Sequence, residues 1–221
     1  TATEAYNGTS WSNQPNLATA RTRMGAASNT PGSPTGLCAG GQTPSATTAT
    51  EEFNFTVNTV VPATWSSGGN LNAARFKMEM NGTQTATIAM GGGTMPSPPS
   101  STTNSEYYDG SSWTAQPAMN NSRQRGGAGA FGTQTAAMSV SGVRTPPAPS
   151  NTVTDTEEWN GSNWTSGGAV PSGRYSACFF GTQTAGVFAG GNPGPSNTGA
   201  TDSAEYNGSS FSSGNAMANG R

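Results

Sequence analysis

The stretch TEEWNGSNWTSGGAVPSGR, residues 156–174, contains an acidic-aromatic segment, an Asn-Gly turn, a second tryptophan and an arginine. This second tryptophan and the arginine are ten residues apart, and the same interval recurs in four other aromatic–arginine pairs. Successive pairs lie roughly 50 residues apart, a period that predicts rigid repeated units joined by variable loops. The five pairs are Trp11 and Arg21, Trp65 and Arg75, Trp113 and Arg123, Trp164 and Arg174, and Phe211 and Arg221.

Each repeat contains four short segments that are typical of β-strands. In the last full repeat the first segment follows the arginine (Ser176 to Phe180) and the second runs into a double glycine (Ala185 to Ala189). The third carries a glutamate and an aromatic residue, and the fourth carries the tryptophan or its equivalent. Asn-Gly or Asp-Gly between the third and fourth segments predicts a hairpin turn. No segment shows the periodicity of an amphipathic helix.

We therefore predict an all-β fold, a β-propeller built of four-stranded antiparallel blades. Stacking such sheets around an axis buries both faces of each sheet, with the aromatic residues between neighbouring blades. A β-solenoid is the alternative, but its coils are shorter and lack hairpin turns. We expect one repeat domain, residues 1–221, with a leading half-blade and four full units. The approximate bounds are 1–20, 21–74, 75–122, 123–173 and 174–221.

The order arginine, hairpin, Gly-Gly, acidic-aromatic strand and tryptophan resembles the kelch repeat over nearly the whole chain. The segments EEWNGSNWTSGG and GTQTAAM are similar to kelch-like repeats in virion and tail-associated proteins of marine bacteriophages. The repeat of Arg123 departs from this pattern, since Ser141-Gly142 replaces the glycine pair, and we expect a distorted blade there. The resemblance implies a kelch-type propeller.

Kelch rings commonly have six or seven blades, so the resemblance favours a piece of a longer ring. A small ring, in which the N-terminal half-blade docks beside the last blade, is the alternative. An unclosed ring would leave sheet edges open. Either further sequence or a partner is therefore expected.

The composition excludes several classes of function. Charged residues make up only 9% of the chain and the net charge is −2, so the basic density of a nucleic-acid-binding protein is missing. No apolar run is long enough to span a membrane, and no signal peptide is evident. We predict an extracellular or virion-surface location, with no nucleic-acid partner and no membrane span.

The sequence offers little for catalysis. It contains no histidine, which removes the commonest catalytic base and metal ligand. We expect the glutamates of the third strand to form one structural ion pair with the arginine of each blade, and we predict no catalytic residue, cofactor or metal site. Cys38 and Cys178 are expected to be buried and unbridged, because sequential blades would place them too far apart. The glutamates are Glu4, Glu51, Glu52, Glu106, Glu157, Glu158 and Glu205.

The loops between the second and third strands vary most, and variable loops on a rigid frame are the usual place of recognition. They span 42–50, 94–104, 143–155 and 192–202 and are rich in Pro, Ser, Thr and Asn. A solvated spacer is the simpler interpretation of these loops. The candidate binding residues are Thr43, Ser45, Thr94, Ser97, Ser100, Asn151, Thr152, Asn192 and Asn197. The predicted structural residues are Trp11, Trp65, Trp113, Trp164, Arg21, Arg75, Arg123 and Arg174.

These observations favour a non-catalytic structural or adhesive module of an extracellular or virion assembly. Its expected partners are sister subunits, other structural proteins or a host-surface glycan. The alternative is a carbohydrate-active or oxidising enzyme on a kelch-like propeller.

Overall fold

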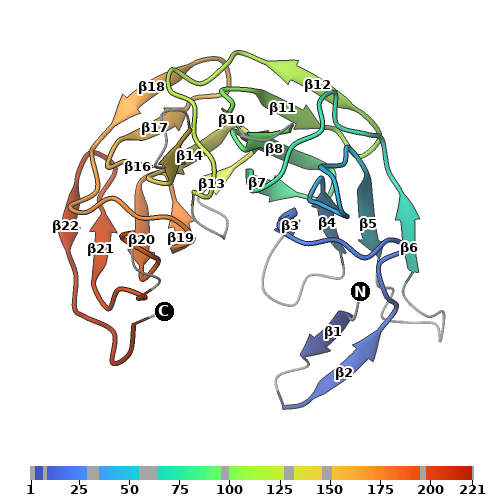
Figure 1. The fold of residues 1–221 in the computed structure, drawn as a ribbon, viewed down its shortest axis with the longest axis horizontal. Helices are drawn as coiled ribbons and strands as arrows, with labels where there is room; N and C mark the ends of the chain where they lie inside the picture. Colours follow the sequence, from blue (N-terminus) through green and yellow to red (C-terminus); the bar gives the residue numbers. More distant parts are fainter. Residues whose placement is uncertain are drawn as a thin grey trace.

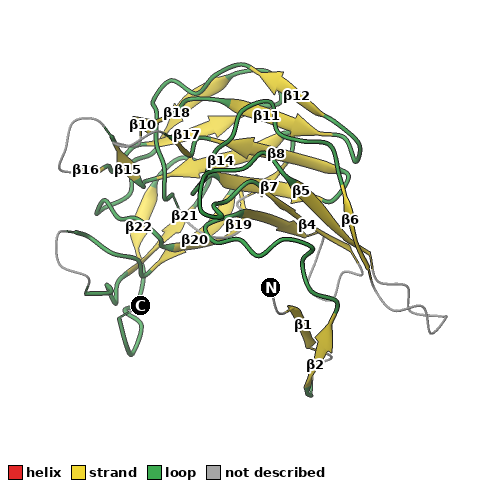
Figure 2. Cartoon of the chain, turned by 45° about the vertical axis from the view of Figure 1, so that its right-hand side comes forward, coloured by secondary structure: helices red, strands yellow, loops and turns green. Residues whose placement is uncertain are grey.

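The protein is all-β in every part of the chain that the structure describes. A computed structural model describes residues 3–6, 9–28, 35–54, 64–95, 100–126, 132–145, 151–194 and 198–220. These ranges contain strands, turns and bends but no helix, as Figure 2 shows. The prediction of an all-β fold of four-stranded antiparallel sheets is therefore confirmed.

Sixteen strands form four antiparallel sheets, which we call sheets I to IV in chain order. In each sheet the order of the strands follows their order along the chain, if the short strands that lie in loops are left out. Sheet I contains β3 (Gly25–Ser28), β4 (Thr35–Ala39), β5 (Thr50–Asn54) and β6 (Thr64–Ser67). Sheet II contains β7 (Glu79–Thr83), β8 (Ala86–Met90), β11 (Ser105–Tyr108) and β12 (Trp113–Gln116). Sheet III contains β13 (Gly132–Thr133), β14 (Ala136–Val140), β17 (Thr156–Trp159) and β18 (Trp164–Gly167), and sheet IV contains β19 (Cys178–Thr182), β20 (Ala185–Ala189), β21 (Ser203–Tyr206) and β22 (Phe211–Ser213).

Three two-stranded ribbons complete the described structure. The first precedes sheet I, and the other two lie in loops of sheets II and III. They are β1 (Thr3–Tyr6) with β2 (Trp11–Gln14), β9 (Gly93–Thr94) with β10 (Ser100–Ser101), and β15 (Val143–Arg144) with β16 (Asn151–Thr152).

The sheets are arranged side by side in an open arc, which gives the molecule a β-propeller-like architecture (Figure 1). The first strand of each sheet lies toward the centre of the arc, and the last strand lies at its outer rim. The β1–β2 ribbon and the C-terminal end lie on the two sides of the opening.

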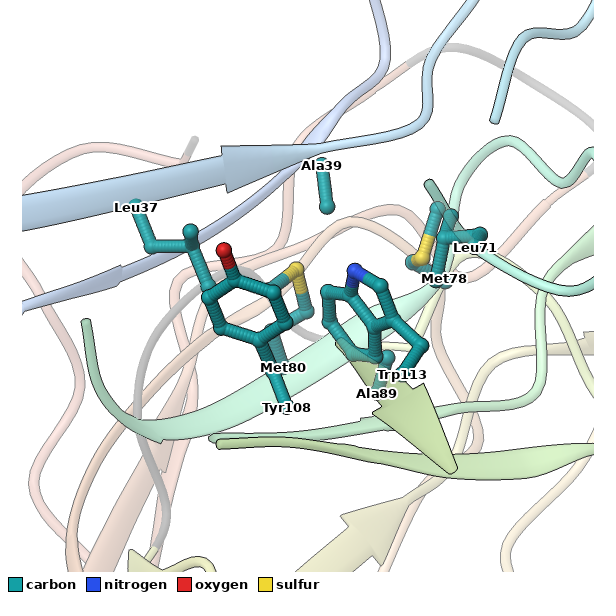
Figure 3. Close-up of a cluster of buried hydrophobic side chains, with 8 residues drawn as sticks. All are labelled: Leu37, Ala39, Leu71, Met78, Met80, Ala89, Tyr108 and Trp113. Carbon is teal, nitrogen blue, oxygen red and sulfur yellow. The ribbon is translucent and has the colours of Figure 1, made fainter. Parts of the chain in front are cut away.

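Apolar side chains fill the space between neighbouring sheets. Between sheets I and II, Leu37 and Ala39 face Met80, Tyr108 and Trp113 in one buried cluster (Figure 3). Equivalent clusters lie between sheets II and III, around Ile88, Met90, Trp159 and Trp164, and between sheets III and IV, around Met138, Val140, Phe188 and Tyr206. Removing this apolar surface from water is the main force that holds the sheets together.

The repeat arginine lies buried inside its own sheet and connects three segments of it. The Arg75 guanidinium donates to the carbonyl oxygens of Gly91 and Asn104 and pairs with the Glu106 carboxylate at 2.5 Å. The Glu106 carboxylate also accepts a hydrogen bond from the Asn72 backbone amide. The predicted ion pair is likewise present between Arg21 and Glu51 and between Arg123 and Glu157. These hydrogen bonds and ion pairs offset part of the cost of burying a charged group.

Sheet IV uses a different carboxylate from the one that the sequence pattern indicated. Ala204 occupies the position of Glu106, and Arg174 pairs with Asp202, just before β21. The predicted partner Glu205 points to the opposite face, because neighbouring residues of a strand alternate between faces.

Polar side chains cross the boundaries between sheets at fixed positions. The Tyr108 hydroxyl donates to Glu52, the Trp159 indole donates to the Tyr107 hydroxyl, and Tyr206 donates to Glu158. The glutamine of each Gly-Thr-Gln-Thr turn reaches back to the preceding sheet. Gln134 donates to the carbonyl of Tyr108 at 3.0 Å, and Gln183 donates to that of Trp159 at 2.9 Å.

Three further expectations are wrong. The repeat of Arg123 is not distorted at Ser141, which adopts the positive φ (58°) of the first glycine elsewhere, while its hydroxyl donates to the Val153 carbonyl and accepts from the Arg174 amide. Cys178 is exposed, because it lies on the open face of sheet IV, whereas Cys38 is buried. Trp11 is 67% exposed and does not fill an inter-sheet space, since in the described structure no sheet packs against that side of β2.

Candidate functional site

An axial cavity of about 440 Å³ lies where the first strands of the sheets begin. Sheets I to IV each contribute one basic or hydroxyl-bearing residue to its lining, at the position two residues after the repeat arginine. These residues are Arg23, Lys77, Arg125 and Ser176. Met78 and Met80, which belong to the cluster in Figure 3, form part of its apolar wall.

Backbone hydrogen bonds explain why these four positions point to the axis. All four residues have positive φ, between 54° and 57°, a conformation that costs free energy for residues other than glycine. The Lys77 amide donates to the Arg23 carbonyl, the Arg125 amide to the Lys77 carbonyl, and the Ser176 amide to the Arg125 carbonyl, each at 3.0 Å. This chain of bonds between sheets stabilises the strained backbone and places the side chains at equivalent positions around the cavity.

The cavity concentrates positive charge. Burial first, and then the nearby Arg125 and Arg23 guanidiniums, together lower the pKa of the Lys77 ammonium to about 8. Neighbouring groups orient the cations. The Arg23 guanidinium donates to Gln42 Oε1 at 3.0 Å, and that of Arg125 lies 5.2 Å from the centre of the Tyr175 ring.

Glu79 is the acidic residue in the cavity lining. It is 7% exposed, and burial raises the pKa of its carboxyl group to about 7, against a smaller opposing effect of the Arg123 guanidinium. The carboxyl group lies over Gly126, where a Cβ atom would stand 1.6 Å from Glu79 Oε1. A carboxylic acid that titrates near neutrality in a cavity is a candidate acid or base.

The predicted binding residues that the structure describes lie at the same end of the sheets as the cavity, because the second strand of an antiparallel sheet ends where the first strand begins. Thr43, Ser45 and Ser100 are exposed, whereas Thr94, Thr152 and Asn192 are half-buried. Asn151 lies in β16 beside Thr152. Ser97 and Asn197 lie outside the described residues.

Two of these loops are joined to each other. The Ser101 amide donates to the Thr145 carbonyl at 2.8 Å, and the two hydroxyl groups lie 3.1 Å apart. The described parts of the loops of sheets II and III are therefore hydrogen-bonded to each other.

The sequence reasoning missed Arg23, Lys77, Arg125 and Glu79. The first three were visible as a second basic residue in Arg-Thr-Arg, Arg-Phe-Lys and Arg-Gln-Arg, but a low total charge hid their convergence. Glu79 was visible as an acidic residue four positions after a repeat arginine, where other repeats have Gly25, Gly127 and Cys178.

The described residues contain no group of three or more His, Cys, Asp and Glu side chains that could hold a metal ion. They also contain no helix with the length and apolar character needed to cross a bilayer.

Comparison with known proteins supports the fold. No family model matches the sequence, and no curated protein matches it. The chain is similar to the solved structure of YjhT, with a TM-score of 0.75 and 11% sequence identity, over 94% of this chain and 69% of that one. At this identity the likeness shows a shared β-propeller-like fold and nothing about activity.

Proposed function

We propose that this chain is a kelch-type β-propeller module with a structural or adhesive role in an extracellular or virion assembly. It binds a glycan or a partner protein through the loops at the cavity end and does not catalyse a reaction. The observation that carries this proposal is that the repeated carboxylates form ion pairs inside the sheets. Glu51, Glu106 and Glu157 all neutralise buried arginines, so the repeated acidic residues support the frame.

The loops supply the recognition surface. Ser, Thr and Asn side chains offer hydrogen bonds to the hydroxyl groups of a sugar, and prolines limit the entropy lost on binding. The hydrogen bonds between Ser101 and Thr145 support this role, because they hold two loops in one arrangement before a ligand binds.

The open face of sheet IV supports the binding of a sister subunit. Phe180, Val187 and Glu205 lie in register across this face, and Phe180 is 56% exposed. In sheets I and III the residues at the position of Glu205 are Glu52 and Glu158, which accept hydrogen bonds from a tyrosine of the next sheet. A second copy of the chain would provide another four-stranded sheet that could pack against this face.

A carbohydrate-active or oxidising enzyme is the second candidate, and one observation favours it. Glu79 differs from its counterparts in the other repeats and lies in the cavity with a pKa near 7. General acid–base catalysis uses a carboxyl group of this kind.

A glycan array combined with a turnover assay distinguishes the two functions. Binding of a glycan that is recovered chemically unchanged supports the module, and replacement of Ser100 and Thr43 by alanine should weaken that binding. Conversion of a bound sugar that is lost in Glu79→Gln, with binding retained, would establish the enzyme and overturn the first proposal.

A further inference from the structure

We propose that Arg23, Lys77 and Arg125 form an axial anion-binding site, which takes the carboxylate, sulfate or phosphate group of a small ligand. This site is separate from the outer loops, and the proposal does not depend on glycan binding by those loops.

The distribution of basic residues supports this site. The chain has nine lysines and arginines, and Arg221 lies outside the described residues. Four of the other eight are the repeat arginines, each paired with a carboxylate in or just before the third strand of its own sheet. Arg144 pairs with Asp155 on a loop. The remaining three, Arg23, Lys77 and Arg125, all line the same cavity.

No carboxylate in the described part of the chain forms a salt bridge with any of these three cations. Glu79, the acidic residue of the lining, has a pKa raised to about 7 by burial and is therefore largely neutral in mildly acidic solution. Three like charges in a partly desolvated space repel one another, and a bound anion removes that repulsion.

The geometry of the cavity suits a small oxyanion. The cations come from three successive sheets at equivalent positions, and the hydrogen bonds between their backbones hold those positions rigid. Gln42 and Tyr175 orient two of the side chains before any ligand binds. The volume of about 440 Å³ lies within the range of small-molecule sites. The Ser176 hydroxyl adds a neutral hydrogen-bonding group on the fourth side.

Isothermal titration at low ionic strength and pH 6.5 tests the site. Sodium sulfate, sodium phosphate and sodium glucuronate are titrated separately into the chain, with glucose as the uncharged control. We expect saturable binding of at least one anion to one site, with a Kd of about 10 mM or below, and no binding of glucose. The three anions show which oxyanion group the site prefers.

Charge variants locate the binding. Lys77→Gln and Arg125→Gln should each weaken anion binding about tenfold or more, the size of a lost charge-assisted hydrogen bond. Thr114→Glu, at an exposed position of β12, changes the net charge equally and should leave the affinity unchanged. If either glutamine variant loses its far-UV spectrum, Arg23→Gln provides the same test from sheet I. Absence of saturable binding, or equal affinity in all variants, would overturn the proposal.

Discussion

The indole of Trp113 donates a hydrogen bond to Thr50 Oγ1 at 3.1 Å, across the boundary between sheets II and I. The same bond links Trp164 to Ser105 Oγ, one repeat further along the chain. Each tryptophan thus combines an apolar surface between two sheets with a satisfied polar group, a combination that buried indoles require.

Replacement of Trp113 by alanine should therefore lower the free energy of unfolding by about 3–5 kcal/mol, the usual effect of a buried aromatic truncation. Urea denaturation measures it. Trp11→Ala is the matched control, because this indole is 67% exposed, and it should change the free energy of unfolding little. Equal effects of the two substitutions would mean that packing between sheets does not depend on the buried indole.

The buried ion pair of Arg75 and Glu106 makes a second prediction. Arg75→Met should lower the free energy of unfolding by about 3–5 kcal/mol, because it leaves a carboxylate buried without its cation. The double variant Arg75→Met, Glu106→Leu should recover much of this loss, since it removes both charges. Arg144→Gln, whose side chain is one third exposed, is the control and should cost about 0–1 kcal/mol. A double variant less stable than Arg75→Met would contradict this account.

Glu79 should make stability depend on pH. The pKa of its carboxyl group is raised to about 7 in the folded protein from an ordinary value of 4.5, so the folded state holds a proton that the unfolded state has lost between these values. Its contribution is complete below pH 4.5 and is lost as the pH rises to 7. Glu79→Gln should equal the original protein in stability near pH 4.5 and exceed it by about 3 kcal/mol at pH 8. Thermal unfolding at several pH values measures the difference, and parallel profiles for the two proteins would contradict it.

Anion affinity should also fall with pH. Above pH 7 the Glu79 carboxylate gains negative charge, and above pH 8 the Lys77 ammonium loses its proton, while Arg23 and Arg125 stay charged. Sulfate titrations at pH 6, 7.5 and 9 should show decreasing affinity. Lys77→Arg should remove the decline between pH 7.5 and 9 and keep the earlier one. A pH-independent affinity in the unmodified chain would contradict the assignment of these two groups.

The open face of sheet IV should cause the chain of residues 1–221 to self-associate, because exposed apolar faces of this kind pack against other protein surfaces. Sedimentation velocity over a range of concentrations should reveal dimers or larger species. Phe180→Asp should reduce this association. Met95→Asp, an equally drastic change at another exposed apolar residue, should not. A chain that is monomeric at every concentration would leave sheet IV without a role in binding a sister subunit.

Much of the frame could be predicted from local pattern. Glycines and Asn-Gly pairs interrupt the chain at regular intervals, which limits each strand to a few residues, and β20 (Ala185–Ala189) has the bounds expected for the second strand. The pairing of Arg75 with Glu106 was also predictable, because a recurrent arginine and a recurrent glutamate in a chain with few charges need each other. By contrast, the sequence could not show that Arg174 pairs with Asp202 and not with Glu205, because both acidic residues lie close to the same strand.

The candidate site could not be predicted in the same way. Arg23, Lys77 and Arg125 are about 50 residues apart in sequence, and nothing local shows that their side chains share one cavity. Variation along the chain favours the loops as a recognition site. Arg23, Lys77 and Arg125 instead occupy a position that recurs in each repeat, and recurrence is typical of structural residues.

The sequence by itself determined the repeat, the hairpin turns and the ion pairs of sheets I to III, because these depend on spacing, turn chemistry and the cost of burying a charge. The first strand of sheet IV begins at Cys178, two residues later than the expected Ser176, and its arginine pairs with Asp202. Only the tertiary structure decided which side chains meet across sheets, from the hydrogen bond between Tyr206 and Glu158 to the three cations around the axis. The physical reason is that stacking around an axis brings equivalent positions of successive repeats together, and the consequence depends on the particular residue at each position.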